Sequence, residues 1–135
     1  MPVFGSRSLS NLAGVHPDLR RVLDEAIKHI DFTVIQGQRG RKAQEAAKAA
    51  GNSNAGFGQS PHNYAPALAV DVIPYPFKDA DWNDIPKFKA IADVVIAEGK
   101  KLGIEITWGG NWKSLKDYPH LELANWKNIR GKLAE

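Results

Sequence analysis

Two segments of the chain place their apolar residues at the three- and four-residue spacing of an amphipathic α-helix. The first covers residues 17–30 and the second covers residues 84–102. In both, the apolar positions form one stripe along the helix, which indicates that this face packs on a core. Asp84 and Gly103 are typical of the two ends of the second helix. The pattern therefore predicts two main helices.

Four shorter segments have the pattern of β-strands. Residues 32–36 and 69–73 are rich in β-branched side chains, and residues 104–108 and 121–123 alternate between apolar and polar positions. Helices and strands do not alternate regularly along the chain, which disfavours a doubly wound parallel sheet. We expect an α+β fold in which a small antiparallel sheet packs with the two main helices.

The remaining segments predict surface structure. Residues 41–50 contain strong helix formers without a large apolar side chain, so they predict a short surface helix. Residues 51–58 are rich in glycine and asparagine and predict a loop, and the residues after 123 read as a polar tail. No repeat or linker interrupts the pattern, so we expect one domain over residues 1–135.

Composition and charge exclude some kinds of site but do not identify the partner of the protein. The chain has no cysteine, which excludes disulfides, thiolate metal sites and a cysteine nucleophile. Its 18 Lys and Arg against 15 Asp and Glu give a net charge of +3. This balance suits nucleic acid, acidic lipid or an acidic wall polymer, and equally a solvated surface. The sequence has neither the apolar run of a signal peptide nor that of a membrane span, so we expect synthesis in the cytoplasm.

Three residues far apart in the sequence could hold a metal ion. His62 follows the glycine-rich loop, Asp71 lies inside an apolar strand, and His120 stands where the last strand begins. Taken singly, the histidines could be structural and the aspartate could be paired in a salt bridge. Together, two imidazoles and one carboxylate form a three-ligand zinc set with a fourth position open to water.

A hydrolytic zinc site also needs a proton carrier that does not bind the metal. Asp117, three residues before His120, is our candidate for this role, with Glu122 as the alternative. Arg39, at the end of the first predicted strand, could bind the developing oxyanion or a carboxylate of the substrate.

Three further residues could contact a substrate. Ser60 is expected to orient the loop or a ligand, and it has no free histidine to activate it as a nucleophile. Trp108 and Trp112 flank a glycine pair and could form a wall of the cleft. Packing of both indoles in the core is an equally good interpretation.

At these residues the chain resembles the LAS metallopeptidases, the superfamily of the D-Ala-D-Ala carboxypeptidases. The resemblance covers residues 8–127 and rests on four segments in the same order as in the family. These segments are Gly37-Gln38-Arg39, Ser60-Pro61-His62 running to Ala69-Val70-Asp71-Val72, Trp108-Gly109-Gly110-Asn111-Trp112, and Asp117-Tyr118-Pro119-His120.

The resemblance implies a LAS/hedgehog-like metallopeptidase fold and assigns roles to these positions. His62, Asp71 and His120 would bind Zn²⁺, and Asp117 would be the catalytic acid and base. Arg39 would assist the carbonyl group or the substrate. One departure is that the segment from His62 to Asp71 is two residues longer than the family usually has. The extra residues must bulge out between loop and strand, which a loop accommodates at small cost.

An aspartate at position 117 and the opening segments 6–9 and 15–19 resemble the phage L-alanyl-D-glutamate endopeptidases. The resemblance implies an endolysin that waits in the host cytoplasm and then cleaves peptidoglycan stem peptides in the periplasmic wall, lysing the cell. It further implies a monomer that neither binds nucleic acid nor inserts stably into membranes. The alternatives are a D-Ala-D-Ala carboxypeptidase on the same fold and a non-catalytic module that binds cell wall or nucleic acid.

Overall fold

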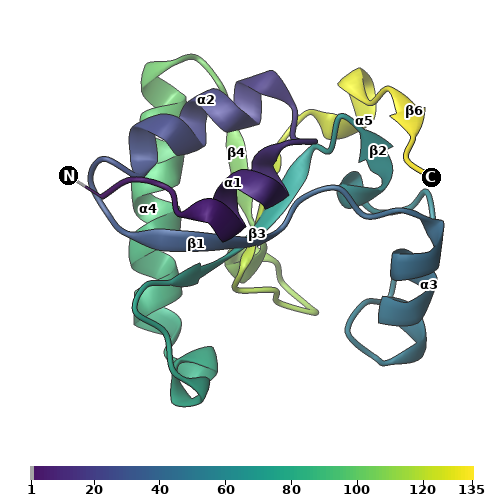
Figure 1. Cartoon of the computed structure of the whole chain (residues 1–135), viewed down its shortest axis with the longest axis horizontal. Helices are drawn as coiled ribbons and strands as arrows, with labels where there is room; N and C mark the ends of the chain where they lie inside the picture. The colour runs from purple at the N-terminus through teal and green to yellow at the C-terminus, as the bar shows by residue number, and fades with distance from the viewer. Residues whose placement is uncertain (1) are drawn as a thin grey trace.

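A computed structural model describes residues 2–135 and places a four-stranded antiparallel sheet at the centre of the molecule (Figure 1). The strand order is β1-β3-β5-β4, as predicted for an α+β fold with a small antiparallel sheet. The strands are β1 (Phe32–Gln36), β3 (Ala69–Pro74), β4 (Ile106–Trp108) and β5 (His120–Leu123). All four predicted strands are therefore present: β1 has the predicted bounds, and the other three differ from them by one or two residues.

The two predicted main helices are α2 (Pro17–Ala26) and α4 (Ile85–Lys101), which pack against each other (Figure 1). Their apolar stripes join one hydrophobic core with the strands. Helix α2 ends four residues before the predicted end. Ile27 and Ile30 still pack against the core from the turns that follow, so the apolar pattern continues past the last helical residue.

The sequence pattern did not predict helix α1 (Ser6–Leu12), which lies along β1 at the edge of the sheet (Figure 1). The Ser8 hydroxyl accepts a hydrogen bond from the backbone N–H of Val34 at 2.9 Å. The side-chain Nδ2 of Asn11 donates to the backbone carbonyl of Val34 at 2.8 Å. These side chains satisfy backbone groups that an edge strand leaves unpaired. A helix this short, in which Leu12 is the one residue that joins the hydrophobic core, has little apolar periodicity to detect.

The prediction of a polar tail after residue 123 was wrong. The segment forms helix α5 (Trp126–Ile129) and strand β6 (Lys132–Leu133), and β6 pairs with β2 (Tyr64–Ala65). Ala134 is 3 % exposed, and its amide donates to the Asn63 carbonyl at 2.8 Å. The tail therefore braces the segment that carries His62.

Side-chain alternation along β3 and β5 separates the core from the site. Val70 and Val72 in β3 and Leu121 in β5 belong to the hydrophobic core. Asp71 and His120 point to the opposite face because successive side chains of a strand alternate. The remaining helices are α3 (Arg41–Ala49), the predicted surface helix, and the short helices η1 (Pro61–Asn63), η2 (Asp79–Asn83) and η3 (Gly109–Asn111).

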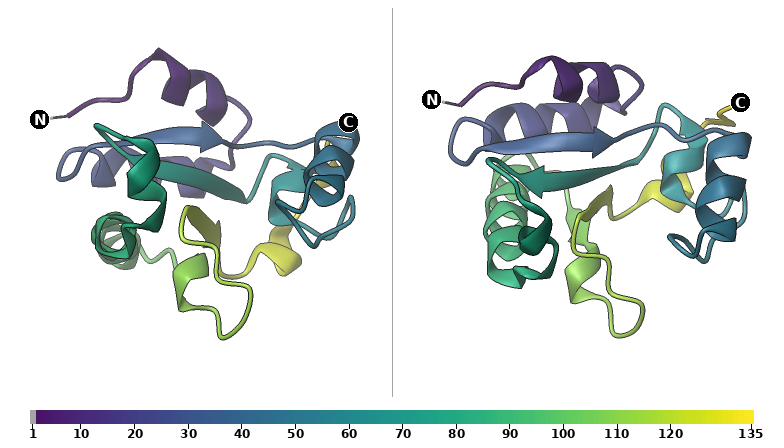
Figure 2. Two further views of the ribbon diagram at one scale, coloured as in Figure 1. Left: turned by 90° about the horizontal axis from the view of Figure 1, so that it is seen from below. Right: turned by 60° about the horizontal axis from the view of Figure 1, so that its bottom comes forward.

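Two loops project from this side of the molecule. In both views of Figure 2, the loop that joins η3 to β5 extends away from the sheet, and the loop after α3 lies to its right. Among residues 2–135, no helix combines the length and the apolar character that crossing a bilayer requires.

Candidate functional site

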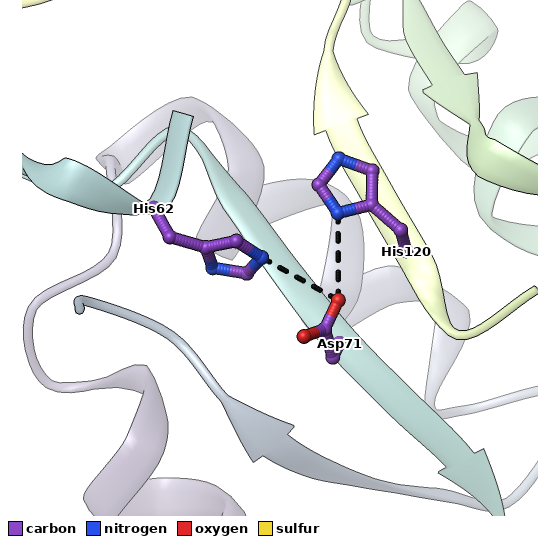
Figure 3. A group of neighbouring side chains, drawn as sticks. All are labelled: His62, Asp71 and His120. Carbon is purple, nitrogen blue, oxygen red and sulfur yellow. Dashed lines mark ion pairs between the residues drawn. The ribbon is translucent and has the colours of Figure 1, made fainter. Parts of the chain in front are cut away.

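His62, Asp71 and His120 meet at the end of the sheet, as the sequence predicted (Figure 3). Asp71 and His120 are directly opposite each other in the antiparallel pair β3–β5, and His62 comes from η1. Asp71 Oδ1 lies 3.4 Å from His62 Nε2 and 3.4 Å from His120 Nδ1. One atom from each residue therefore faces a common point.

The second nitrogen of each imidazole has a fixed partner. His62 Nδ1 is 2.7 Å from the Gly37 carbonyl, so it must carry the proton and donate it. His120 Nε2 is 2.6 Å from Glu122 Oε1 and donates in the same way. In the neutral imidazoles, His62 Nε2 and His120 Nδ1 then present lone pairs to Asp71, which is the orientation that metal-ligating histidines take.

With the imidazoles in this form, a ring nitrogen and a carboxylate oxygen face each other, and neither carries a proton to donate. His62 Nε2 and Asp71 Oδ1 are both buried and have no hydrogen-bond partner among the described residues. Buried polar atoms are rarely left unpaired, and a lone pair facing a carboxylate oxygen is repulsive. A cation removes both problems. The three ligand atoms lie within 4.8 Å of one another, and an N, N, O set suits Zn²⁺ with one position open.

In the protein without metal, a proton neutralises part of this cluster. Burial opposes charge on His120, but Asp71 and Glu122 outweigh it and raise the pKa of His120 to about 9. Burial likewise opposes charge on Asp71, but His62 and His120 hold the pKa of this carboxyl well below its ordinary value. Asp71 is thus ionised whenever the fold is intact at neutral pH.

Asp117 reaches the same point from the loop before β5. Its Oδ2 is 4.0 Å from His120 Nδ1, and its side chain is 46 % exposed. Partial burial and the nearby charge of Asp71 raise the pKa of Asp117 above its ordinary value. A carboxyl at the edge of this cluster, exposed to solvent and with a raised pKa, is better suited to accept and return a proton than an ordinary aspartate.

The glycine pair after β4 places Asp117. The Asp117 amide donates to the Gly109 carbonyl at 3.1 Å, so the loop folds back onto η3. A Cβ on Gly109 would lie 2.3 Å from the Asp117 carbonyl, and a Cβ on Gly110 would lie 2.3 Å from the Trp108 ring. Both positions require glycine because backbone and ring approach so closely.

Arg39 contacts the carboxylate oxygen of Asp71 that the two histidines do not face. Its Nη2 is 3.5 Å from Asp71 Oδ2, and its Nη1 donates to Gln44 Oε1 at 2.9 Å. A bulge at Ile35 shifts the register of β1 against β3 and turns the chain toward the site. Gly37 then passes so close to α1 that a Cβ would lie 2.2 Å from the Asn11 carbonyl.

A cleft of about 850 Å³ opens over the cluster. Ser60 lines it, and its hydroxyl accepts a hydrogen bond from the His62 amide at 3.2 Å, in keeping with an orienting role. Trp112 also lines the cleft, with its ring centroid 5.1 Å from that of His120. Trp108 does not: it is 4 % exposed, and its indole donates to the Tyr118 carbonyl at 2.7 Å.

The structure corrects the roles of two residues named from sequence. Trp108 packs behind the site, so the core-packing alternative holds and a place on the cleft wall is excluded. Glu122, the alternative proton carrier, does not line the cleft and contacts the far nitrogen of His120. Both residues support the side chains that face the cleft.

Sequence reasoning missed two buried carboxamides beside the site, those of Gln44 and Asn63. Asn63 directly follows His62, and Gln44 is five residues after Arg39. The sequence offers a signal for Gln44 alone. Its helix, α3, has no large apolar side chain that could pack it on the core, so a polar residue must do so.

Comparison with known proteins gives the family. The model of the phage L-alanyl-D-glutamate peptidase family matches residues 2–127. The chain is 34 % identical over 117 residues to the L-alanyl-D-glutamate peptidase of Escherichia phage T5, covering 85 % of each chain. It is 35 % identical over 129 residues to the peptidoglycan L-alanyl-D-glutamate endopeptidase CwlK of Bacillus subtilis (strain 168), covering 81 % of this chain and 73 % of CwlK.

A solved structure agrees with these relatives. The crystal structure of the Serratia marcescens L-Ala D-Glu endopeptidase ChiX superposes with a TM-score of 0.74 at 36 % identity, covering 93 % of this chain and 92 % of ChiX. The fold and site therefore define a peptidase. The chain belongs to the phage L-alanyl-D-glutamate peptidase family, which confirms the resemblance noted in the sequence.

Proposed function

We propose that this protein is a zinc-dependent endopeptidase that hydrolyses the L-alanyl-D-glutamate bond of peptidoglycan stem peptides. The relatives named for that bond support the substrate. The proposal of a metal ion rests on one observation. Two buried acceptors without partners, His62 Nε2 and Asp71 Oδ1, converge on one point next to His120 Nδ1. A salt bridge between protonated His120 and Asp71 would occupy Asp71 Oδ1 but would still leave His62 Nε2 buried without a partner.

The proposed mechanism divides the work among these side chains. His62, Asp71 and His120 would hold Zn²⁺, which when bound would polarise the scissile carbonyl and acidify a water molecule. Asp117 takes the proton of the attacking water and returns it to the leaving amine of D-Glu, so one carboxyl acts as base and then as acid. Arg39 stabilises negative charge on the carbonyl oxygen or holds the carboxylate of D-Glu.

The cleft supplies the surface for the peptide. Ser60 and Trp112 lie on its wall, within the same opening as Asp117 and Arg39. We assign the stem peptide to this cleft. We further propose an endolysin that is made in the host cytoplasm and, once released, acts as a monomer on the periplasmic wall. The similarity to a phage enzyme supports the phage origin of this role.

The products of wall digestion test the assignment. The protein is loaded with zinc, incubated with purified peptidoglycan, and the fragments are analysed by mass spectrometry with and without a chelator. Stem peptides that begin with D-Glu, formed only without the chelator, are expected. Loss of a terminal D-Ala would instead identify a carboxypeptidase, and an absence of any hydrolysis would leave only a binding module.

The role of Asp117 has its own test. Replacing Asp117 by Asn removes the group that carries the proton but leaves the three ligands, so we expect normal zinc content and a kcat lower by about 10²–10⁴-fold. Asp93, an exposed residue of α4, offers a matched control: Asp93→Asn should keep both zinc and rate. If Asp117→Asn is fully active, another group carries the proton.

A further inference from the structure

We propose that Gln44 is a positioning residue that sets the Arg39 guanidinium in the site and fixes the neighbouring wall of the cleft, residues 51–55. This inference rests on the proposed function, because it matters for catalysis only if Arg39 contacts the substrate. Gln44 itself lies behind the cleft and is 0 % exposed. It therefore acts through the residues with which it forms hydrogen bonds.

The Gln44 carboxamide uses all four of its hydrogen-bonding positions. Its Oε1 accepts from Arg39 Nη1 at 2.9 Å and from Asn63 Nδ2 at 3.1 Å. Its Nε2 donates to Ser53 Oγ at 3.1 Å and to the Ala55 carbonyl at 2.8 Å. A primary amide has two donors and two acceptor lone pairs, so this orientation is fully determined. The oxygen side holds Arg39, and the nitrogen side holds the loop.

Asn63 extends the same network to the metal ligand. Its Oδ1 accepts from the Gly58 and Ser60 amides at 2.9 and 3.2 Å, and its Nδ2 also donates to the Arg39 carbonyl at 3.1 Å. Asn63 is 0 % exposed and directly follows His62. The two carboxamides thus join the backbone of Arg39, the loop and the segment of His62 in one buried polar cluster, in which a missing partner is costly.

The surroundings of Gln44 argue against simple packing. It is the buried residue of α3, whose other side chains are partly or fully exposed. A helix normally docks on a core through an apolar stripe, whereas α3 is attached by one polar side chain. Without Gln44 Oε1, Arg39 Nη1 loses its partner, and Asp71 Oδ2 is the remaining contact that orients the guanidinium.

A double-mutant cycle on the zinc-loaded protein tests the coupling. Gln44→Met keeps the length of the side chain and removes the four hydrogen bonds. We expect unchanged zinc content and a kcat/KM lower by about tenfold. In an Arg39→Ala background, the same substitution should change kcat/KM by less than about threefold, because residues that act through one another are not additive. Equal losses in both backgrounds would overturn the proposal.

A second readout needs no substrate. Hydrogen exchange of the Arg39 side-chain N–H groups, followed by NMR, should be slow in the zinc-loaded wild type and fast in Gln44→Met. Unchanged exchange would overturn the inference whatever the enzyme cleaves. If the wild type does not cut the L-Ala–D-Glu bond, the proposed function fails, while this measurement still decides the position of Arg39.

Two further variants separate the arms of the network. Gln44→Glu can accept from Arg39 but cannot donate to Ala55, so it should keep Arg39 exchange slow and speed exchange of the amides in residues 51–55. The opposite pattern would contradict the assignment, and this test stands even if Gln44→Met does not fold. Glu45→Met on the exposed side of α3 is the matched control and should change neither measurement.

Discussion

Each histidine of the site is oriented by a hydrogen bond on the nitrogen that faces away from Asp71. For His62 the partner is a backbone carbonyl, that of Gly37, which substitution of a side chain cannot remove. For His120 it is the Glu122 carboxylate, at 2.6 Å. Since Glu122 is two residues after His120 on the same strand face, the orientation is local to β5. Glu122 therefore orients the His120 ring and does not contact the substrate.

Replacing Glu122 by Gln tests this role. The amide accepts the His120 Nε2–H less strongly than a carboxylate, so we expect zinc affinity to fall by about 10–100-fold. The measurement is competition for zinc with a chelating dye. Glu105→Gln, at an exposed position, is the control for the same chemical change. Equal affinities of Glu122→Gln and wild type would show that the contact does not support the ligand.

The raised pKa of His120 predicts how zinc binding depends on pH. Asp71 and Glu122 stabilise the protonated ring in the metal-free protein and raise the pKa of His120 to about 9, although burial opposes this. Zinc needs the neutral ring, so binding at pH 7 must displace that proton. Affinity should thus rise about tenfold per pH unit between pH 7 and 9 and then level off.

Calorimetry in buffers of different ionisation enthalpy measures this proton directly. At pH 7 at least one proton should be released per zinc ion, and above the pKa of His120 the release should decline. Release of no proton at pH 7 would mean that His120 is already neutral in the metal-free protein.

At the scale of elements, the site depends on pairs of segments that meet only in the fold. The β3–β5 register brings Asp71 opposite His120, and the bulge in β1 directs the segment with Gly37 and Arg39 to the same end of the sheet. Strand β2, which contains two residues of the longer segment between His62 and Asp71, pairs with β6. This longer segment therefore contributes one strand to a second, two-stranded sheet.

The pairing of β6 predicts a role for the last residues of the chain. Removing residues 132–135 takes away the buried Ala134 and leaves the Asn63 carbonyl, next to His62, without its partner. We expect a loss of about 1–3 kcal/mol in the free energy of unfolding, together with weaker zinc binding. Urea unfolding and dye competition measure the two effects. Lys132→Ala, which keeps the backbone of β6, should change neither, and an unaffected truncation would contradict the bracing role.

At the scale of the whole molecule, the metal and the fold are thermodynamically linked. The ligands come from η1, β3 and β5, and in the unfolded chain they are nine and forty-nine positions apart. An ion that binds only the folded arrangement stabilises it, by about 2.7 kcal/mol at a free concentration one hundred times the Kd. For a chain of this length, that corresponds to a rise in Tm of about 10 °C.

Thermal unfolding with and without zinc tests this linkage. The wild type should show the rise in Tm, and His120→Ala should show little or none because one ligand is missing. A similar zinc effect in both proteins would place the metal elsewhere on the chain. The same variant should lose activity on purified wall.

Apolar periodicity alone determined the two main helices and the strands, because burial of one face dictates a repeat of 3.6 or 2 residues. The residue types were likewise sufficient to name His62, Asp71 and His120, since a carboxylate within an apolar strand needs a partner. Elements as short as α1 and β6 left no such repeat. Only the tertiary structure decided which side of each ring carries the proton, that Trp108 is buried, and that Gln44 joins Arg39 to the cleft wall. Hydrogen bonds between distant segments depend on distances and directions, which the order of residues does not specify.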